Sequence, residues 1–462
     1  MARRQKWSPL HAAIATLLAT LLAQQPSASL AVEPLVTAAS ALPDSGLGPT
    51  TAPPWNPPRA IARRRPWEQA VLLPGRIATL PLSALGWSAE HTLLWAEDRG
   101  LFHGPSTVRK AANAPFGVRF HGPALGDRVG FGGTAEVNTS FLKRRNRTYV
   151  TVAQSSTQHD YQDTHVTLFR NLPIEYDHQW RPWDRFYGVG MGSSIDSLID
   201  FATLTQSYKA TAHIQWNRRD VTRAPRTEAA AWLGSRGTVI RRGREPGTST
   251  LGQRFPEITD ALLDRRFEQL VYGARFASDW RVGAPHWTEG WRVLIQSERY
   301  DKPLGWTSLV TTNPGAQFTR TTVELETGFS FMRAPRSLRV MGRVVDTGVS
   351  SGLDRMRLDD YAQLGGRTGL RRFPPGRFHD LDLVLGRLSY VFPLQRFFEM
   401  EAHVETGAVY PNLTRAPRLD QLEQSFGLLF RPRSDQHPLA SAGIEWSKEA
   451  VRLVFTLSDP DK

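Results

Sequence analysis

The feature that most constrains this chain is an alternation of apolar and polar residues that begins near Phe116 and continues to the C-terminus. Successive side chains of a β-strand point to opposite faces of a sheet, so a period of two predicts strands with one apolar and one polar face. The clearest runs are residues 208–216, 270–277, 323–331, 388–392, 442–447 and 451–458. Several runs approach the roughly 9–11 residues that a tilted strand needs to cross a membrane.

Two all-β architectures are compatible with this alternation, a soluble sandwich and a membrane barrel. The inner face of a sandwich is apolar, and its strands average about 5–6 residues. Here the runs are longer, and their polar face carries charged residues such as Lys209, Arg275 and Glu324. Charged side chains fit a wet lumen, with the apolar face directed at lipid. The pattern therefore favours an all-β transmembrane barrel over residues 115–462.

The length of this region predicts the number of strands. At roughly 22 residues for a strand and its connection, the region provides about 16 antiparallel strands, an even number as in bacterial barrels. Aromatic residues near the ends of the runs fit the interfacial girdles of membrane proteins, and they are Trp216, Trp280, Trp291, Tyr300, Tyr390, Phe392 and Trp446. The arginine-rich stretch between Trp216 and Phe267 is predicted to be one long surface loop, either solvated or in contact with anionic lipid head groups.

The N-terminal residues have a different composition. Residues 1–31 are typical of a secretory signal peptide, with a basic start, an apolar run over 12–23 and small residues at the end. Residues 32–65 are rich in Pro and Ala and indicate a flexible linker. Residues 66–114 combine loosely helical spacing with Pro and Gly interruptions, which predicts a periplasmic leader of two or three short helices.

Composition and spacing argue against several kinds of chemistry. The chain has no cysteine, which excludes disulfides, thiolate metal sites and cysteine nucleophiles. Its 12 histidines lack His-x-x-x-His or His-x-His spacing, and Gly188–Ser193 fits neither a nucleophile elbow nor a dinucleotide loop. His159, Asp160 and Asp163 are interpreted as a polar loop tip. We therefore expect no enzymatic activity, with no catalytic residue, cofactor or metal.

The charge of the chain bears on its partners. A formal net charge of +13 is compatible with binding to nucleic acid. An exported protein meets little nucleic acid, so we expect no nucleic-acid partner. Outer-membrane lipid and lipopolysaccharide are the expected partners of a basic surface, although solvated loop charge alone also accounts for the excess of arginine.

One stretch, Leu364 to Phe378, fits neither a strand nor a helix. Glycine, which adopts left-handed backbone conformations readily, occurs at four positions: Gly365, Gly366, Gly369 and Gly376. Apolar residues and arginines are interleaved among them: Leu370, Phe373, Phe378, Arg367, Arg371, Arg372 and Arg377. The stretch is either an ordinary solvated basic loop or a loop that folds back onto a surface that accepts both apolar and cationic groups.

The residues in and after this stretch resemble a known family. Leu370-Arg371-Arg372-Phe373 is similar to the Val/Leu-Arg-Gly-Phe/Tyr signature in the sixth extracellular loop of the surface-antigen barrels, the superfamily that includes BamA, TamA and the two-partner secretion transporters. Arg372 stands where the family has glycine. Glu405-Thr406-Gly407 resembles the Asp-x-Gly of the family's next strand, with Glu in place of Asp. The specific motifs are confined to about residues 360–410, whereas the architectural likeness covers the whole predicted barrel.

The resemblance implies a location and a function. It implies a bacterial cell outer-membrane protein that helps to insert or translocate proteins or lipids, with nascent outer-membrane proteins or a periplasmic protein as partners. Transport members carry POTRA modules that bind clients, and residues 32–115 show no such β-α-α-β-β repeat. The alternative function is therefore a passive pore or a structural envelope barrel without a role in transport or assembly.

The resemblance also implies that the loop folds into the lumen. Arg371 then needs a carboxylate partner, because a guanidinium keeps its proton. Glu401, His403 and Glu405 share one face of a strand at a spacing of two. We predict that Arg371 pairs with Glu405 or, failing that, with Glu401, in a pair worth about 1–3 kcal/mol. Arg372 is predicted to point elsewhere, to solvent or to a second acidic side chain.

Loop length predicts the orientation of the barrel. Bacterial barrels have short turns on the periplasmic side and longer loops outside. The short connections at residues 333–335 and 393–396 are therefore predicted to be periplasmic. The stretch from Trp216 to Phe267 and the loop over residues 347–378 are predicted to lie outside.

Overall fold

The computed structural model describes the strands and most of the connections that follow residue 115. The described residues are 116–126, 130–142, 146–155, 162–168, 174–216, 226–243, 249–250, 263–281, 289–303, 313–330, 336–366, 369–394, 398–413, 419–432 and 441–456. All of them belong to one structural unit. The signal peptide, linker and helical leader predicted for residues 1–114 lie outside the described residues, as do His159 and Asp160.

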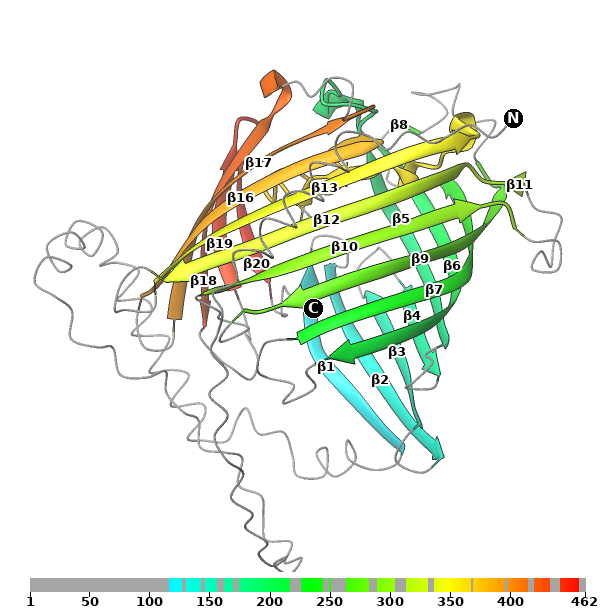
Figure 1. Ribbon diagram of the computed structural model, residues 1–462. Coiled ribbons are helices and arrows are strands. Elements are labelled where there is room, and N and C mark those ends of the chain that lie inside the picture. The colour runs from blue at the N-terminus through cyan, green and yellow to red at the C-terminus, as the bar shows by residue number, and fades with distance from the viewer. Residues whose placement is uncertain are drawn as a thin grey trace, which may run out of the picture. The chain divides into compact units, whose positions relative to one another are not determined.

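An antiparallel sheet forms the wall of a barrel (Figure 1). Within the described residues the sheet has 18 strands, of which β8 (Ser249–Thr250) and β11 (Asn313–Pro314) are two residues long. The other sixteen make the wall, and the prediction of about 16 strands is confirmed. In chain order they are β1 (Phe116–Gly126), β2 (Gly130–Leu142), β3 (Asn146–Ser155), β4 (Gln162–Leu168), β5 (Ile174–Phe186), β6 (Ile199–Trp216), β7 (Arg226–Arg242), β9 (Arg266–Asp279), β10 (Gly290–Asp301), β12 (Gln317–Ser330), β13 (Ser337–Ser351), β16 (Asp382–Pro393), β17 (Phe398–Tyr410), β18 (Glu423–Pro432), β19 (Ser441–Ser447) and β20 (Val451–Thr456).

Each wall strand pairs with the next wall strand in the chain, as in the ladders β6–β7, β12–β13 and β16–β17. The last strand, β20, lies against β1, which brings the two ends of the sheet together. Because successive strands run in opposite directions, their connections fall alternately at the two ends of the barrel. Residues 243–265 and 352–381 connect strands at one end, whereas 331–336 and 394–397 connect strands at the other. The two connections predicted to be periplasmic thus lie at the same end of the barrel, opposite the connections over residues 243–265 and 352–381.

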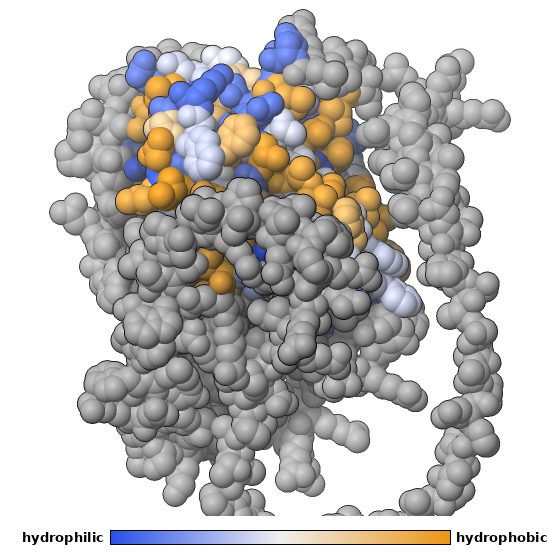
Figure 2. Space-filling model, turned by 90° about the vertical axis from the view of Figure 1, so that its left-hand side faces the viewer, coloured by the Kyte–Doolittle hydropathy of each residue, from blue (hydrophilic) through white to orange (hydrophobic). Residues whose placement is uncertain are grey.

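The two faces of the wall differ in polarity. Exposed large hydrophobic residues mark the outward face on strand after strand: Tyr208, Ile214, Leu233, Tyr272, Phe276, Phe329, Val340, Leu388, Leu428, Ile444 and Leu453. Figure 2 shows one side of the wall, where hydrophobic residues dominate the described surface and hydrophilic residues gather toward its upper edge. Charges fill the lumen face, as where Glu324 binds Arg343 at 2.6 Å and Arg292 at 3.1 Å. The predicted polar lumen and apolar outer face are confirmed.

The prediction of one long loop between Trp216 and Phe267 is wrong. The stretch contains β7, which pairs along its length with β6 and β9. A barrel strand tolerates arginine on its lumen face, as at Arg236, and near its outer end on the outward face, as at Arg241. The arginine content of the stretch therefore did not indicate a loop.

Tyr300 is not a girdle residue, in contrast to the prediction. It is 7% exposed and stacks on Phe318 with ring centroids 4.3 Å apart, in a cluster with Ala316 and Met356. Its place in β10 puts it on the lumen face, because the outward residues of β10 are those of odd number. Other predicted girdle residues do stack at the opposite end of the barrel: Trp280 on Trp291 and Tyr390 on Phe392.

Short elements lie within the connections. The 3-10 helices are η1 (Ile195–Ser197), η2 (Leu353–Arg355), η3 (Leu358–Asp360) and η5 (Leu419–Gln421). A separate ladder pairs β14 (Ala362–Leu364) with β15 (Phe378–Asp380). Among the described residues, no helix has both the length and the apolar character needed to cross a membrane.

Candidate functional site

The candidate site is the loop between β13 and β16, residues 352–381, which we call the lumen loop. It lies inside the barrel, because its residues contact lumen-facing side chains of β7, β9 and β12 on one wall and of β13, β16 and β17 on another. Its central part is the stretch from Leu364 to Phe378 that the sequence singles out. The ends of that stretch are strand residues of β14 and β15, and Arg367 lies outside the described residues.

Tight turns shape the backbone of the lumen loop. Five glycines of the loop have positive φ angles between 67° and 157°. Four of them were predicted, Gly365, Gly366, Gly369 and Gly376, and the fifth is Gly352 at the start of the loop. Leu370 also has a positive φ, of 50°, a conformation that costs a residue with a side chain about 1–3 kcal/mol. Arg372 is not among the positive-φ residues, so arginine can stand where the resembling family has glycine. The Gly366 N–H donates to the Phe373 carbonyl at 2.8 Å and closes the turn around Leu370.

Apolar packing holds the strained turn against the wall. Four side chains of the loop are almost completely buried: Leu364, Leu370, Phe373 and Phe378. They pack against residues of β13, β16 and β17, namely Met341, Val345, Leu383, Leu385 and Val409. Full burial of one such side chain contributes about 1.5–3 kcal/mol. The four together therefore outweigh the backbone strain at Leu370 and fix the loop to this wall before any ion pair is considered.

Glu405 of β17 is the acidic centre on the same wall. It is 0% exposed and accepts the Arg371 backbone N–H at 2.7 Å, while Arg371 Nε lies 3.7 Å from its Oε1. Arg387, directly opposite on β16, donates to Oε1 from Nε at 2.6 Å, and Ser425 Oγ donates to Oε2 at 3.1 Å. The structure thus brings Arg371 and Glu405 together, but the closer guanidinium contact of Glu405 is with Arg387. Arg371 contributes mainly its backbone N–H.

Glu401 and His403 share the lumen face of β17 with Glu405 but bind other groups. Glu401 accepts from Ser389 Oγ at 2.9 Å and lies 3.3 Å from Nη1 of Arg431. His403 is 5% exposed, and its Nε2 lies 3.9 Å from Glu445 Oε1. Glu401 therefore joins neighbouring wall strands, whereas Glu405 also receives the loop.

Two further arginines attach the loop to neighbouring connections. Arg372 is 7% exposed, and its Nε donates to the carbonyl of Ala450 in the β19–β20 turn, a partner that differs from both predicted ones. Arg377 is 4% exposed and lies 2.8 Å from Glu449 in the same turn. It also donates to Ser193 Oγ at 2.9 Å in the β5–β6 connection. The sequence did not indicate that these two connections support the loop.

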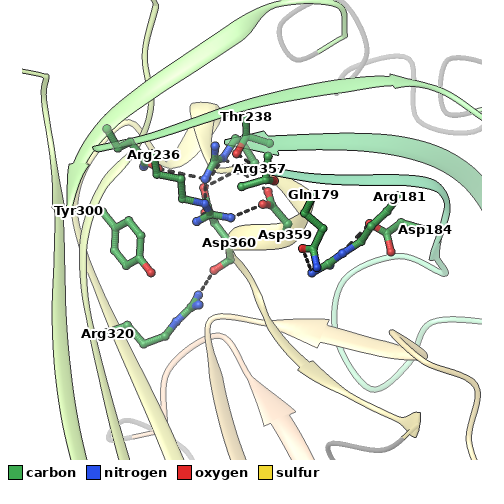
Figure 3. Close-up of polar contacts among 12 residues, drawn as sticks. Gln179, Arg181, Asp184, Arg236, Thr238, Tyr300, Arg320, Arg357, Asp359 and Asp360 are labelled. Carbon is green, nitrogen blue, oxygen red and sulfur yellow. Dashed lines mark hydrogen bonds and ion pairs between the residues drawn. The ribbon is translucent and has the colours of Figure 1, made fainter. Parts of the chain in front are cut away.

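A second acidic centre lies on the other side of the lumen loop, in η3 (Figure 3). Arg357 is 0% exposed and donates to Asp360 from Nε at 2.8 Å and from Nη2 at 2.7 Å. Arg236 of β7 donates to Asp360 Oδ1 at 2.9 Å and also binds Asp359. Arg320 of β12 donates to the Asp360 backbone carbonyl. Two wall strands thus hold one turn of the loop from different directions.

Neutral contacts complete this second centre. Gln269 of β9 accepts from Arg357 Nη2 at 3.0 Å and donates to the Ala316 carbonyl at 2.8 Å. Leu358, between Arg357 and the two aspartates, is 1% exposed and packs in a cluster of wall residues: Phe186, Ile199, Phe201 and Ile240. Both charged and apolar side chains of residues 357–360 therefore contact the wall, and together they hold this segment in one position.

The two buried aspartates of the loop differ in protonation behaviour. Burial raises the pKa of Asp360, but the guanidiniums of Arg357 and Arg236 outweigh it and lower the pKa to about 2. Burial also raises the pKa of Asp380, and the Leu381 N–H, which donates to it at 2.8 Å, opposes this only partly. Asp360 thus remains an anion that fixes the loop over the ordinary range of pH.

Sequence reasoning did not identify Arg357, Asp359 or Asp360. A signal is present in retrospect, because Asp-Arg-Met-Arg-Leu-Asp-Asp over residues 354–360 mixes opposite charges with apolar residues in one short run. In the part of the chain that the structure describes, no three His, Asp or Glu residues form a group that could hold a metal ion. The site consists of ion pairs, hydrogen bonds and apolar contacts that attach the loop to the wall.

Comparison with known proteins gives structural relatives only, since no family model and no curated protein matches the sequence. The crystal structure of BamA from Haemophilus ducreyi lacking POTRA domains 1-3 is similar, with a TM-score of 0.50 and 11% identity over 73% of this chain and 68% of that chain. CdiB from Acinetobacter baumannii has a TM-score of 0.40 and 10% identity over 73% of this chain and 58% of that one. CdiB from Escherichia coli has a TM-score of 0.41 and 13% identity over 71% and 58%. This chain spans less than two thirds of the CdiB chains, and the likeness to BamA establishes a shared barrel fold.

Proposed function

We propose that this protein is a bacterial outer-membrane β-barrel of the BamA/TamA surface-antigen superfamily that assists the insertion or translocation of proteins or lipids. The observation that carries the proposal is the lumen loop, which presents Leu370-Arg371-Arg372-Phe373 to Glu405 inside the barrel. The barrel fold shared with BamA supports it. The proposed partners are outer-membrane lipid and either nascent outer-membrane proteins or a periplasmic protein.

The anchoring of the loop favours this role over permanent passage of solutes. A passive pore works best with an unobstructed lumen, whereas here one loop contacts β7 and β12 on one side and β17 on another. A loop held by ion pairs and apolar packing is closed at rest and can be displaced by a partner that supplies competing contacts. We also propose that the protein is not an enzyme, so the purified barrel should hydrolyse neither lipid nor peptide.

The alternative function is a passive pore or structural barrel that has kept the fold. It is favoured by the sequence before the barrel, which shows no POTRA-like repeat over residues 32–115. The two functions differ in what they require of the lumen loop. A structural barrel needs only a stable plug, a passive pore needs an open path, and an insertion factor needs a plug that moves when a client arrives.

Two measurements test the proposal in sequence. In detergent, unboiled protein should migrate faster on a gel than boiled protein, because a closed barrel leaves no free strand edge and resists unfolding. Liposomes that contain the folded protein should then accelerate the protease-resistant folding of an added unfolded barrel client, relative to liposomes with boiled protein. Equal client folding together with a large steady conductance in a planar bilayer would favour the pore. Identical gel mobility would reject the barrel itself.

A further inference from the structure

Three arginines lie on the outward face of the wall, toward the end that carries the long connections over residues 243–265 and 352–381. They are Arg241 of β7, Arg266 of β9 and Arg299 of β10. Arg299 is opposite Tyr272 in the β9–β10 ladder, and opposite residues of an antiparallel ladder point to the same side. Tyr272 is 40% exposed on the outward face, and Arg266 is six residues from it on the same strand. Arg241 likewise shares the face of Leu233, eight residues earlier on β7, which is 54% exposed. We call these three residues the outer arginine belt.

Contacts with neighbouring residues hold the side chains of the belt against the outer wall. Arg266 donates to Gln206 Oε1 at 2.8 Å and to Glu268 Oε1 at 3.0 Å, so it reaches across β7 to β6. The side chain has room for this path because residue 237 is glycine. A Cβ at that position would lie only 2.7 Å from Nη2 of Arg266. Arg241 is exposed and lies over the ring of Trp180, 5.8 Å from the centroid.

Arg299 of the belt is held in the same manner. Its Nη1 donates to Thr319 Oγ1 of the neighbouring strand β12 at 3.0 Å and to Ser350 Oγ of β13, the strand beyond it, at 2.7 Å. Asp301 Oδ2 lies 3.7 Å from its Nε, at 34% exposure of the aspartate side chain. The guanidinium therefore lies against the wall with its side chain still 27% exposed. Neutral oxygens are its closest partners, which leaves most of its charge available to an external anion.

The depth of the belt matches a membrane boundary. On β10, Trp291 marks the opposite interface, and eight residues separate it from Arg299. Eight residues span about 27 Å along a strand, or about 20 Å along the axis of a barrel whose strands tilt by about 40°. The apolar band of an outer-membrane barrel is about 25 Å tall. The residues between Trp291 and Arg299 on this face, Val293, Ile295 and Ser297, then face hydrocarbon, and the belt meets the head groups.

We propose that the outer arginine belt binds the phosphate groups of lipopolysaccharide in the outer leaflet. This inference rests on the proposed outer-membrane location and goes beyond it by assigning the lipid to named residues. A guanidinium matches a phosphate with two parallel hydrogen bonds. The long loops place this end of the barrel outside the cell, where the leaflet is built from phosphorylated glycolipid. Three guanidiniums on neighbouring strands suit a head group that carries more than one phosphate.

The test compares two double variants of the full chain in neutral phosphatidylcholine nanodiscs doped with lipopolysaccharide. R241Q/R299Q removes two charges from the belt, and R226Q/R275Q removes two charges from the lumen, where both arginines bind Glu228. Bound lipopolysaccharide is measured after affinity capture of the barrel. We expect about fivefold weaker retention for each belt arginine removed and no change for the lumen variant. R241K/R299K should recover only part of the retention, because lysine restores the charge without the planar pair of donors. Heat-modifiable gel mobility of each variant establishes that it is folded.

The possible results distinguish failure of the lipopolysaccharide site from failure of the proposed outer-membrane barrel. Equal retention by wild type and folded R241Q/R299Q overturns the belt as the binding site. Equal arginine-dependent retention of phosphatidylglycerol in a parallel nanodisc overturns the assignment to lipopolysaccharide. If the wild-type protein shows no heat-modifiable mobility, the barrel proposal itself is rejected. A folded barrel that does not retain lipopolysaccharide rejects only the belt.

Discussion

The lumen loop is held on two walls, and the two attachments differ in kind. At Asp360, the carboxylate and the backbone carbonyl are contacted by three arginines, one of the loop and two of the wall. At Glu405, the loop contributes a backbone N–H at 2.7 Å and a guanidinium nitrogen at 3.7 Å. We call these the Asp360 anchor and the Glu405 anchor. In the first the loop supplies the carboxylate, whereas in the second the wall supplies it.

The difference matters for how the loop can move. Displacing the Asp360 anchor takes the carboxylates of Asp359 and Asp360 away from Arg236 and leaves this wall arginine without either of them, which is costly at low dielectric. Displacing the Glu405 anchor leaves Glu405 paired with Arg387, so no buried charge becomes unpaired. The ion pair at Glu405 therefore breaks at a lower electrostatic cost than the contacts of Asp360, although the apolar packing of Leu370 and Phe373 still holds this side of the loop against the wall.

Removing the Asp360 carboxylate should have the largest effect. In Asp360→Ala, Arg357 keeps its buried position without its principal partner, and Arg236 retains only Asp359. Loss of one partner of a buried pair costs about 3–5 kcal/mol. The midpoint of urea unfolding in lipid vesicles measures the change. Asp420→Asn, at an exposed position in η5, is the matched control and should be nearly neutral. A fall of less than about 1 kcal/mol in the free energy of unfolding would show that the anchor is not fixed.

The Asp360 anchor should also make stability depend on acid pH. The folded-state pKa of Asp360, about 2, lies below the unfolded value of about 3.9, so this carboxylate contributes stability above the unfolded value. That contribution, about 2–3 kcal/mol, should be lost as the pH falls from about 4 to about 2. Urea titrations at several pH values should show wild type converging on Asp360→Asn in this window. Parallel curves for the two proteins would contradict the assigned pKa.

Truncation of Arg371 should have a smaller effect than either change at Asp360. The side chain is 25% exposed and its nitrogen is 3.7 Å from Glu405, whereas the backbone N–H bond at 2.7 Å survives the substitution. We expect Arg371→Ala to lower the free energy of unfolding by about 1 kcal/mol, near the value of an exposed pair. In bilayers it should raise the frequency of channel openings, which Asp420→Asn should not do. A loss as large as that of Asp360→Ala would make the two anchors equivalent.

The wall of the barrel could be predicted from the sequence because a period of two fixes the face of every strand residue. The same rule placed Glu401, His403 and Glu405 on the lumen side of β17, next to the loop. The prediction is wrong at β7, because arginine content does not distinguish a loop from a strand whose lumen positions accept charge. Tyr300 shows the same limit, since its aromatic ring suggested a girdle while its parity in β10 placed it inside.

The Asp360 anchor could not be predicted for a different reason. Arg236 and Asp360 are 124 residues apart, and their contact depends on how far the loop reaches across the lumen. The path of the loop includes turns at positive-φ residues, of which four glycines were predicted and Gly352 and Leu370 were not. A local pattern predicts which residues face the lumen, but which lumen residues meet across it depends on the tertiary path of the loop.

Arg372→Ala should have the smallest effect, although Arg372 is more buried than its neighbour Arg371. Its hydrogen-bond partner is the Ala450 carbonyl in a short turn, a neutral acceptor that water can satisfy when the guanidinium is removed. No buried carboxylate loses its counter-ion, so we expect a loss of about 0.5–1 kcal/mol. Arg377→Ala is the comparison variant. It removes the ion pair at 2.8 Å with Glu449 of the same turn and the hydrogen bond to Ser193 Oγ. If Arg372→Ala destabilised the barrel more than Arg377→Ala, the β19–β20 turn would be held by the neutral contact, and charge pairing would no longer explain the ranking of the loop's attachments.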